Sequence, residues 1–83
     1  MVNKYRKTPV EIEAIQWTGD NFEEICNFVN KELAISPTGT TIVIETLEGN
    51  MFADKADFII KGVQGEFYPC KPDIFRSTYE KVE

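Results

Sequence analysis

The chain of 83 residues contains no histidine, only two cysteines and no long apolar run. Without histidine it cannot build the Cys–His or Ser–His–Asp arrangements in which a base activates a nucleophile. Cys26 and Cys70 lie far apart, which favours neither a zinc site nor a disulfide framework. No segment approaches membrane-spanning length, and the polar, proline-containing start of the chain leads us to expect no secretory signal. We therefore expect a reduced, cytoplasmic protein that is not an enzyme and uses no metal, cofactor or membrane.

Charge and size set further limits. The 14 acidic and 9 basic residues give a net charge of −5, which speaks against nucleic acid as a partner because such binding needs a lysine and arginine stripe. The 42% hydrophobic content is that of a folded protein, so we expect a single domain over residues 1–83. A chain this short buries only roughly 60% of its unfolded surface. We therefore expect a homo-oligomer.

The first nine residues form a basic segment. Lys4, Arg6 and Lys7 hold a third of the positive charge of the chain. Two interpretations remain open: a solvated, frayed terminus, and an arm that contacts an anionic group.

A strand and a helix are predicted next. Alternation over residues 10–17 slips once, which predicts a strand with a bulge near Ala14 and Ile15. Asp20 is placed as the N-cap of a helix, with Glu23 completing a capping box. The apolar stripe of this helix comprises Phe22, Ile25, Cys26, Val29 and Leu33.

Residues 34–39 have the composition of a loop, and residues 40–47 that of the strongest strand. Because apolar residues fall on both faces of this strand, we expect it to be central and covered. A turn then leads to a strand at residues 51–53. Its corner is either Glu48–Gly49 or Gly49–Asn50, and the sequence leaves both open.

The centre of the chain is a predicted hairpin of residues 58–61 and 66–70 around the glycine loop 62–65. A loop of two or four residues places Lys61 opposite Glu66 and Ile60 opposite Phe67. The expected core face then comprises Phe58, Ile60, Phe67 and Pro69. The expected partner-facing side comprises Ile59, Lys61, Glu66, Tyr68 and Cys70. We expect the glycines on either side of Val63 to take the unusual backbone angles of the turn.

Pro72 is placed to start one helical turn, and residues 76–82 alternate as a last short strand. The fold class predicted is α+β: a mostly antiparallel, twisted sheet of five or six strands, or a partly open barrel, packed with one helix. The expected order is β-α-β-β-β-β-β.

The residues favour a binding surface over a catalytic site. Cys70 is the one candidate nucleophile, because the adjacent ammonium of Lys71 can lower a thiol pKa, but the chain offers no base. Flat rings and charges on a rigid sheet are typical interface anchors. The candidate binding residues are Trp17, Lys61, Glu66, Tyr68, Lys71 and Arg76. Whether Trp17 is core or anchor stays open, and Lys61 with Glu66 can be a simple cross-strand ion pair.

Two stretches carry a resemblance to known proteins: KTPVEIEAIQWTG at residues 7–19, and DFIIKGVQGEFYPCKPDIF at residues 57–75 with TYE at 78–80. Over nearly its whole length the chain resembles short proteins common in bacteriophage and prophage genomes, whose pattern reads KPVxIEAIQWTG and GDWIIKGVxGEFYPCKPDIFxxTYE. It departs from them at residues 55–58, where they tend to have a Gly-Asp-Trp turn. We expect a less sharp turn here.

The resemblance implies a small protein that acts inside an infected bacterium. We expect a non-enzymatic binder that counters a host defence, by sequestering a nucleotide-type signal molecule or by blocking a host protein. A nucleotide would use Lys61, Lys71 or Arg76 for phosphate and Trp17 or Tyr68 for the base. The alternative is a structural or accessory phage protein that acts through self-assembly.

Overall fold

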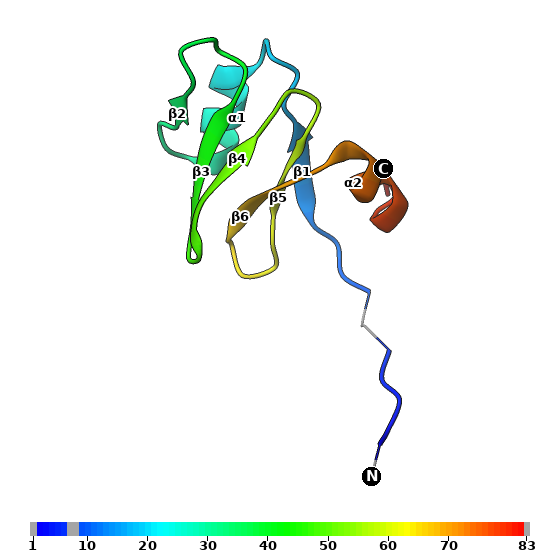
Figure 1. The fold of residues 1–83 in the computed structure, drawn as a ribbon. Coiled ribbons are helices and arrows are strands. Elements are labelled where there is room, and N and C mark those ends of the chain that lie inside the picture. The colour runs from blue at the N-terminus through cyan, green and yellow to red at the C-terminus, as the bar shows by residue number, and fades with distance from the viewer. Residues whose placement is uncertain (1, 7–8, 83) are drawn as a thin grey trace.

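The computed structural model describes residues 2–6 and 9–82. The described chain has six strands and two helices, and it belongs to the predicted α+β class (Figure 1). The elements are β1 Glu13–Gln16, α1 Phe22–Val29, β2 Ala34–Ile35, β3 Ile42–Thr46, β4 Gly49–Ala53, β5 Phe58–Lys61, β6 Phe67–Cys70 and α2 Pro72–Thr78. The order differs from the prediction in two places: an additional short strand, β2, follows α1, and a helix replaces the predicted last strand.

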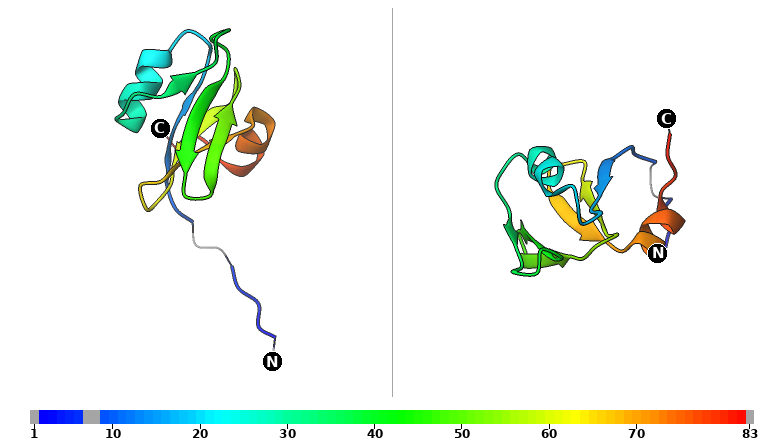
Figure 2. Two further views of the ribbon diagram at one scale, coloured as in Figure 1. Left: turned by 60° about the vertical axis from the view of Figure 1, so that its left-hand side comes forward. Right: turned by 90° about the horizontal axis from the view of Figure 1, so that it is seen from above.

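The strands form two antiparallel sheets of three, in the orders β1-β5-β6 and β2-β3-β4. β6 packs against β3 and β4 of the other sheet. Seen from above, the two sheets and α1 surround the core from different sides (Figure 2). The arrangement is not a closed barrel, and the single curled sheet that we predicted is instead split in two.

The core lies between the two sheets and α1. Its buried members are Trp17, Ile25, Val29, Ile42, Ile44, Ala53 and Ile59. Trp17 is only 1% exposed, and its indole Nε1 donates a hydrogen bond to the Thr40 carbonyl at 3.0 Å. A buried tryptophan with its N–H satisfied stabilises the core without cost to the polar group. Trp17 is therefore a core residue, which decides the question that the sequence left open.

The predicted register of the β5–β6 hairpin was wrong by one residue. Lys61 pairs with Phe67 and Ile59 pairs with Pro69. The Gly62 N–H donates to the Glu66 carbonyl at 2.7 Å, so the loop holds three residues. An odd loop length shifts the pairing by one relative to an even one, and such loops end on a residue in the left-handed region. Gly65 is that residue, with φ of 85°.

The shift in register exchanges the faces of the hairpin. Ile59 is fully buried in the core, although we assigned it to the partner-facing side. Phe58 and Ile60 lie on the opposite face, where α2 covers Phe58 through a ring stack with Phe75. Both faces of this sheet are thus covered, because β6 leads directly into α2. The predicted open, mixed face does not exist.

The bulge predicted at Ala14 and Ile15 is absent, because β1 pairs regularly with β5. A β-bulge lies instead at the start of β5. The Trp17 N–H donates to the Asp57 carbonyl at 2.8 Å, and the Ala56 N–H donates to the Trp17 carbonyl at 2.7 Å. Two residues therefore face one, as in a bulge. Ala56 adopts φ of 80° there. The turn is formed even though alanine occupies it.

α1 begins at a different cap from the one predicted. Asn21, not Asp20, is the N-cap residue, and its side chain forms no cap hydrogen bond. Its Oδ1 accepts from the Thr18 N–H at 3.0 Å, and its Nδ2 donates to the Gln16 carbonyl at 2.9 Å. The side chain therefore fixes the β1–α1 connection. The helix ends at Val29, which leaves Leu33 outside it.

The second sheet also departs from the prediction. Residues 34 and 35 form β2 where a loop was expected. β3 is central in its sheet, but only the face with Ile42 and Ile44 is buried, while Glu45 on the other face is exposed. Leu47 is fully exposed in the turn. Because Thr46 pairs with Gly49, Leu47 and Glu48 form the corner of the β3–β4 hairpin. Neither of the two corners considered from the sequence is correct.

α2 replaces the strand predicted at residues 76–82. Pro72 starts it as predicted, but the helix continues to Thr78 instead of stopping after one turn. Phe75 and Tyr79 lie four residues apart, on one helical face. Their ring centroids are 5.1 Å apart, and Phe75 stacks on Phe58 at 4.0 Å. This aromatic contact stabilises a helix where we predicted a strand.

Candidate functional site

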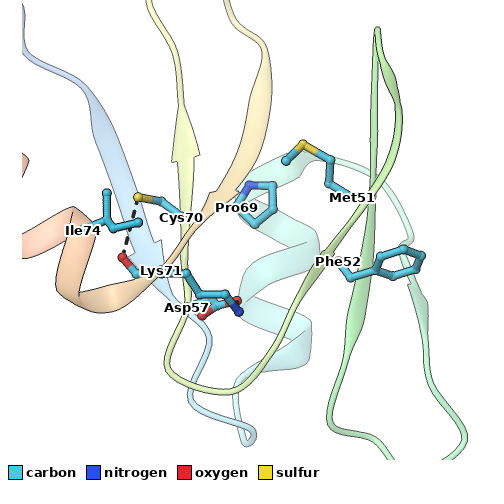
Figure 3. Close-up of a pocket in the computed structure, with 7 residues that line it drawn as sticks. All are labelled: Met51, Phe52, Asp57, Pro69, Cys70, Lys71 and Ile74. Atoms are coloured by element: carbon cyan, nitrogen blue, oxygen red, sulfur yellow. Dashed lines mark hydrogen bonds and ion pairs between the residues drawn. The ribbon is translucent and has the colours of Figure 1, made fainter.

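A pocket of about 310 Å³ opens between β4, the end of β6 and the start of α2. Its apolar lining comes from Met51, Phe52, Pro69 and Ile74, and Asp57, Cys70 and Lys71 complete it. Figure 3 shows Met51 and Pro69 on facing elements, with the Phe52 ring turned away from them. The volume lies at the lower end of ligand pockets, which is room for one side chain of a partner or a small ligand.

Local structure explains why these side chains meet. Met51 pairs with buried Ile44, and Pro69 pairs with buried Ile59, so both lie on the core side of their strands at the sheet margins. Both β4 and β6 are edge strands, and a proline is tolerated on such an edge because it removes one outward N–H. Ile74 follows on the first turn of α2 and is 56% exposed.

The polar wall of the pocket is an ion cluster. Asp57 is 2% exposed, and its Oδ2 accepts from the Asp54 N–H at 2.9 Å and from the Lys71 Nζ at 3.0 Å. Lys71 also reaches Asp54 Oδ2 at 3.4 Å. Its hydrogen bonds to Asp57 and Asp54 raise the pKa of Lys71. Its charge is therefore matched by two carboxylates, which weakens it as a phosphate ligand.

Cys70 is not activated. Burial, followed by the negative charges of Asp57 and Asp73, raises the pKa of its thiol. We expected the ammonium of Lys71 to lower this pKa, but that ammonium is held by the two aspartates instead. A thiol with a raised pKa is mostly protonated near neutral pH and is a poor nucleophile.

The six predicted site residues do not converge. Lys71 alone lines the pocket, and Trp17 lies in the core. Lys61 sits at the hairpin end of β5, opposite Phe67 on one side and Glu13 on the other. It is not opposite Glu66, whose Oε1 instead accepts from the Gln64 N–H at 3.0 Å within the loop. The cross-strand pair that we considered is therefore absent from the register.

Tyr68 and Arg76 both lie on the α2 side of the sheet. The Arg76 guanidinium lies 5.5 Å from the centre of the Phe58 ring, a cation–π distance. Burial, then the neighbouring Tyr79, raises the pKa of Tyr68. Because Phe75 stacks on the same Phe58 ring, these groups hold α2 in place.

Sequence reasoning missed Met51, Asp57 and Ile74, which join the pocket from β4, from the β4–β5 connection and from α2. One signal was present in the sequence: Asp57 stands directly before the apolar run of β5, where a buried carboxylate needs a cation. Ile74 could not be recognised as an exposed residue of a helix while residues 76–82 were predicted to form a strand.

Comparison with protein-family models, with curated proteins and with solved structures gives no match to this chain. In residues 2–6 and 9–82, neither helix has the length and apolar character needed to cross a membrane. The same residues contain no group of three or more histidine, cysteine, aspartate or glutamate side chains placed to hold a metal ion.

Proposed function

We propose that this protein is a non-enzymatic binding protein that acts by engaging another protein at the pocket between β4, β6 and α2. The observation that carries the proposal is an apolar pocket beside the edge strand β4. An exposed strand edge binds an extended segment through main-chain hydrogen bonds, and a neighbouring pocket selects one of its side chains. The resemblance to phage proteins makes a host defence protein the expected partner.

A nucleotide-type ligand is less well supported. Lys71 is paired with two aspartates, while Arg76 and Lys61 lie on other parts of the molecule. Trp17 is buried and offers no ring to a base. A nucleotide site needs free cations and an accessible ring around one pocket. Blocking a protein is thus the better of the two modes that the sequence suggested.

The proposal is tested in bacteria that each carry one defined defence system. Expression of the protein is expected to raise the plaque count of a restricted phage in at least one strain. Ile74→Asp places a charge in the pocket from an exposed helical position and should abolish this effect. The matched control, Leu47→Asp, lies in the β3–β4 turn and should keep it. Equal activity of Ile74→Asp and the unsubstituted protein, or no response in any strain, would contradict the proposal.

A further inference from the structure

The N-terminal segment stands apart from the rest of the molecule. Residues 2–6 and 9–12 form no helix or strand, and the segment extends away from both sheets (Figures 1 and 2). Val2 is 96% exposed and Tyr5 is 90% exposed. An extended segment that presents an aromatic ring to water gains free energy if that ring is buried against another surface.

The distribution of charge along the chain indicates which surface would bury the Tyr5 ring. Residues 1–9 contain Lys4, Arg6 and Lys7 and no acidic residue. The other six basic residues and all 14 acidic residues lie within residues 10–83, which therefore carry a net charge of −8. A cationic segment joined to an anionic body is attracted to the body of another copy.

The pocket has the matching chemistry. Asp54, Asp57 and Asp73 lie at or near it, and Lys71 is the one basic residue among the described residues that line it. Its interior is mostly apolar and beside it runs the edge of β4. This combination fits an extended segment in which an aromatic side chain is flanked by basic residues, and Lys4-Tyr5-Arg6 is such a segment.

We propose that the N-terminal segment of one copy docks along the β4 edge of a second copy, with Tyr5 in the pocket and Lys4 and Arg6 against its acidic rim. The inference rests on the proposed function, because it names an occupant for the same protein-binding pocket. The segment fills the pocket until another protein displaces it. Exchange of such segments also supplies the burial that a short chain lacks.

Complementary variants of the full chain test the exchange. Tyr5→Ser removes the inserted side chain, and Ile74→Asp blocks the pocket. Sedimentation velocity of the unsubstituted protein should show a species of twice the chain mass or larger, which grows with concentration and weakens with salt. Each variant alone should sediment as a monomer. Their one-to-one mixture should regain a dimer, because one chain supplies the segment and the other the pocket.

The inference would be overturned by a monomeric unsubstituted protein at all concentrations, by self-association of both variants as strong as that of the parent, or by a mixture that stays monomeric. An effect of Tyr5→Ser without concentration dependence would place the segment on its own chain, and it also overturns exchange. Failure here is separable from failure of the proposed function, because the plaque assay reports the pocket whether or not the copies associate.

Discussion

At the scale of single residues, the backbone conformation of Ala56 positions Asp57, which lines the pocket. The left-handed backbone of Ala56, with φ of 80°, forms the bulge that turns the chain into β5. The bulge brings Asp57 under Lys71, since the Asp57 carboxylate also accepts the Asp54 N–H across the turn. A side chain at this backbone conformation costs about 1–2 kcal/mol, which glycine avoids.

Ala56→Gly should therefore raise the free energy of unfolding by about 1 kcal/mol. The matched control is Ala14→Gly in β1, which should lower it by about 0.5–1 kcal/mol because glycine weakens a strand interior. Urea denaturation of both variants measures the two effects. An Ala56→Gly variant as unstable as Ala14→Gly would show that the bulge does not hold the residue in the left-handed region.

The carboxylate of Asp54 links acid stability to the same cluster. A hydrogen bond from the Thr41 hydroxyl at 3.0 Å, followed by the interaction with Lys71, lowers the pKa of Asp54 below 3.8. A folded-state pKa that is depressed stabilises the protein above pH 3.8, and the contribution is lost as the pH falls through the folded value.

Thr41→Val should move the pKa of Asp54 upward, towards 3.8, and shift acid unfolding to higher pH. Carboxyl NMR titration measures the pKa directly. Ser77→Ala is the control, because the Ser77 hydroxyl donates to the Ile74 carbonyl instead. An Asp54 pKa that is unchanged in Thr41→Val would contradict the assigned cause.

At the scale of elements, α2 forms the wall of the pocket that carries Ile74. Its attachment depends on the face-to-face stack of Phe75 and Phe58, whose ring planes meet at 9°. Alternation in residues 76–82 favoured a strand, but local pattern contains no information on the distant ring of Phe58. Tertiary contact therefore decided this element.

Phe75→Ala should lower the free energy of unfolding by about 2 kcal/mol, because it removes a half-buried ring and its stack. Its neighbour gives the control: Ile74→Ala, at an exposed position, should stay within about 0.5 kcal/mol of the parent. Chemical denaturation gives both values, and hydrogen exchange should show α2 opening first in Phe75→Ala. Equal stability of the two variants would contradict this account of α2.

Hairpin registers show a second limit of prediction at this scale. The β3–β4 and β5–β6 hairpins were predicted correctly from composition, and Gly65 was predicted correctly as a turn residue. The three-residue loop of the β5–β6 hairpin was not, and one residue of shift moved Ile59 from a surface to the core. Loop length depends on backbone angles that Gly62 and Gly65 both permit, so the sequence alone does not determine whether this loop has two, three or four residues.

At the scale of the whole molecule, the α+β class and the antiparallel pairing could be predicted, because they follow from alternation and turn residues. The split into two sheets could not, since it depends on β6 packing across β3 and β4. The pocket arises at that junction from Met51, Pro69 and Ile74. Of the residues proposed from the sequence, only Lys71 lies there. Trp17 is in the core, Lys61 and Glu66 lie at the turn end of the hairpin, and Tyr68 and Arg76 lie on the side that α2 covers.

Protein binding at this pocket can be tested by photo-crosslinking in bacterial cells. A photo-crosslinking residue replaces Ile74 in one variant and Leu47, in the exposed β3–β4 turn, in the other. We predict discrete adducts at position 74 and none at position 47. An adduct with a different protein supports the proposed function, and an adduct that maps to the N-terminal segment of a second copy supports the exchange. No adduct at position 74, or the same adducts at both positions, would contradict the account.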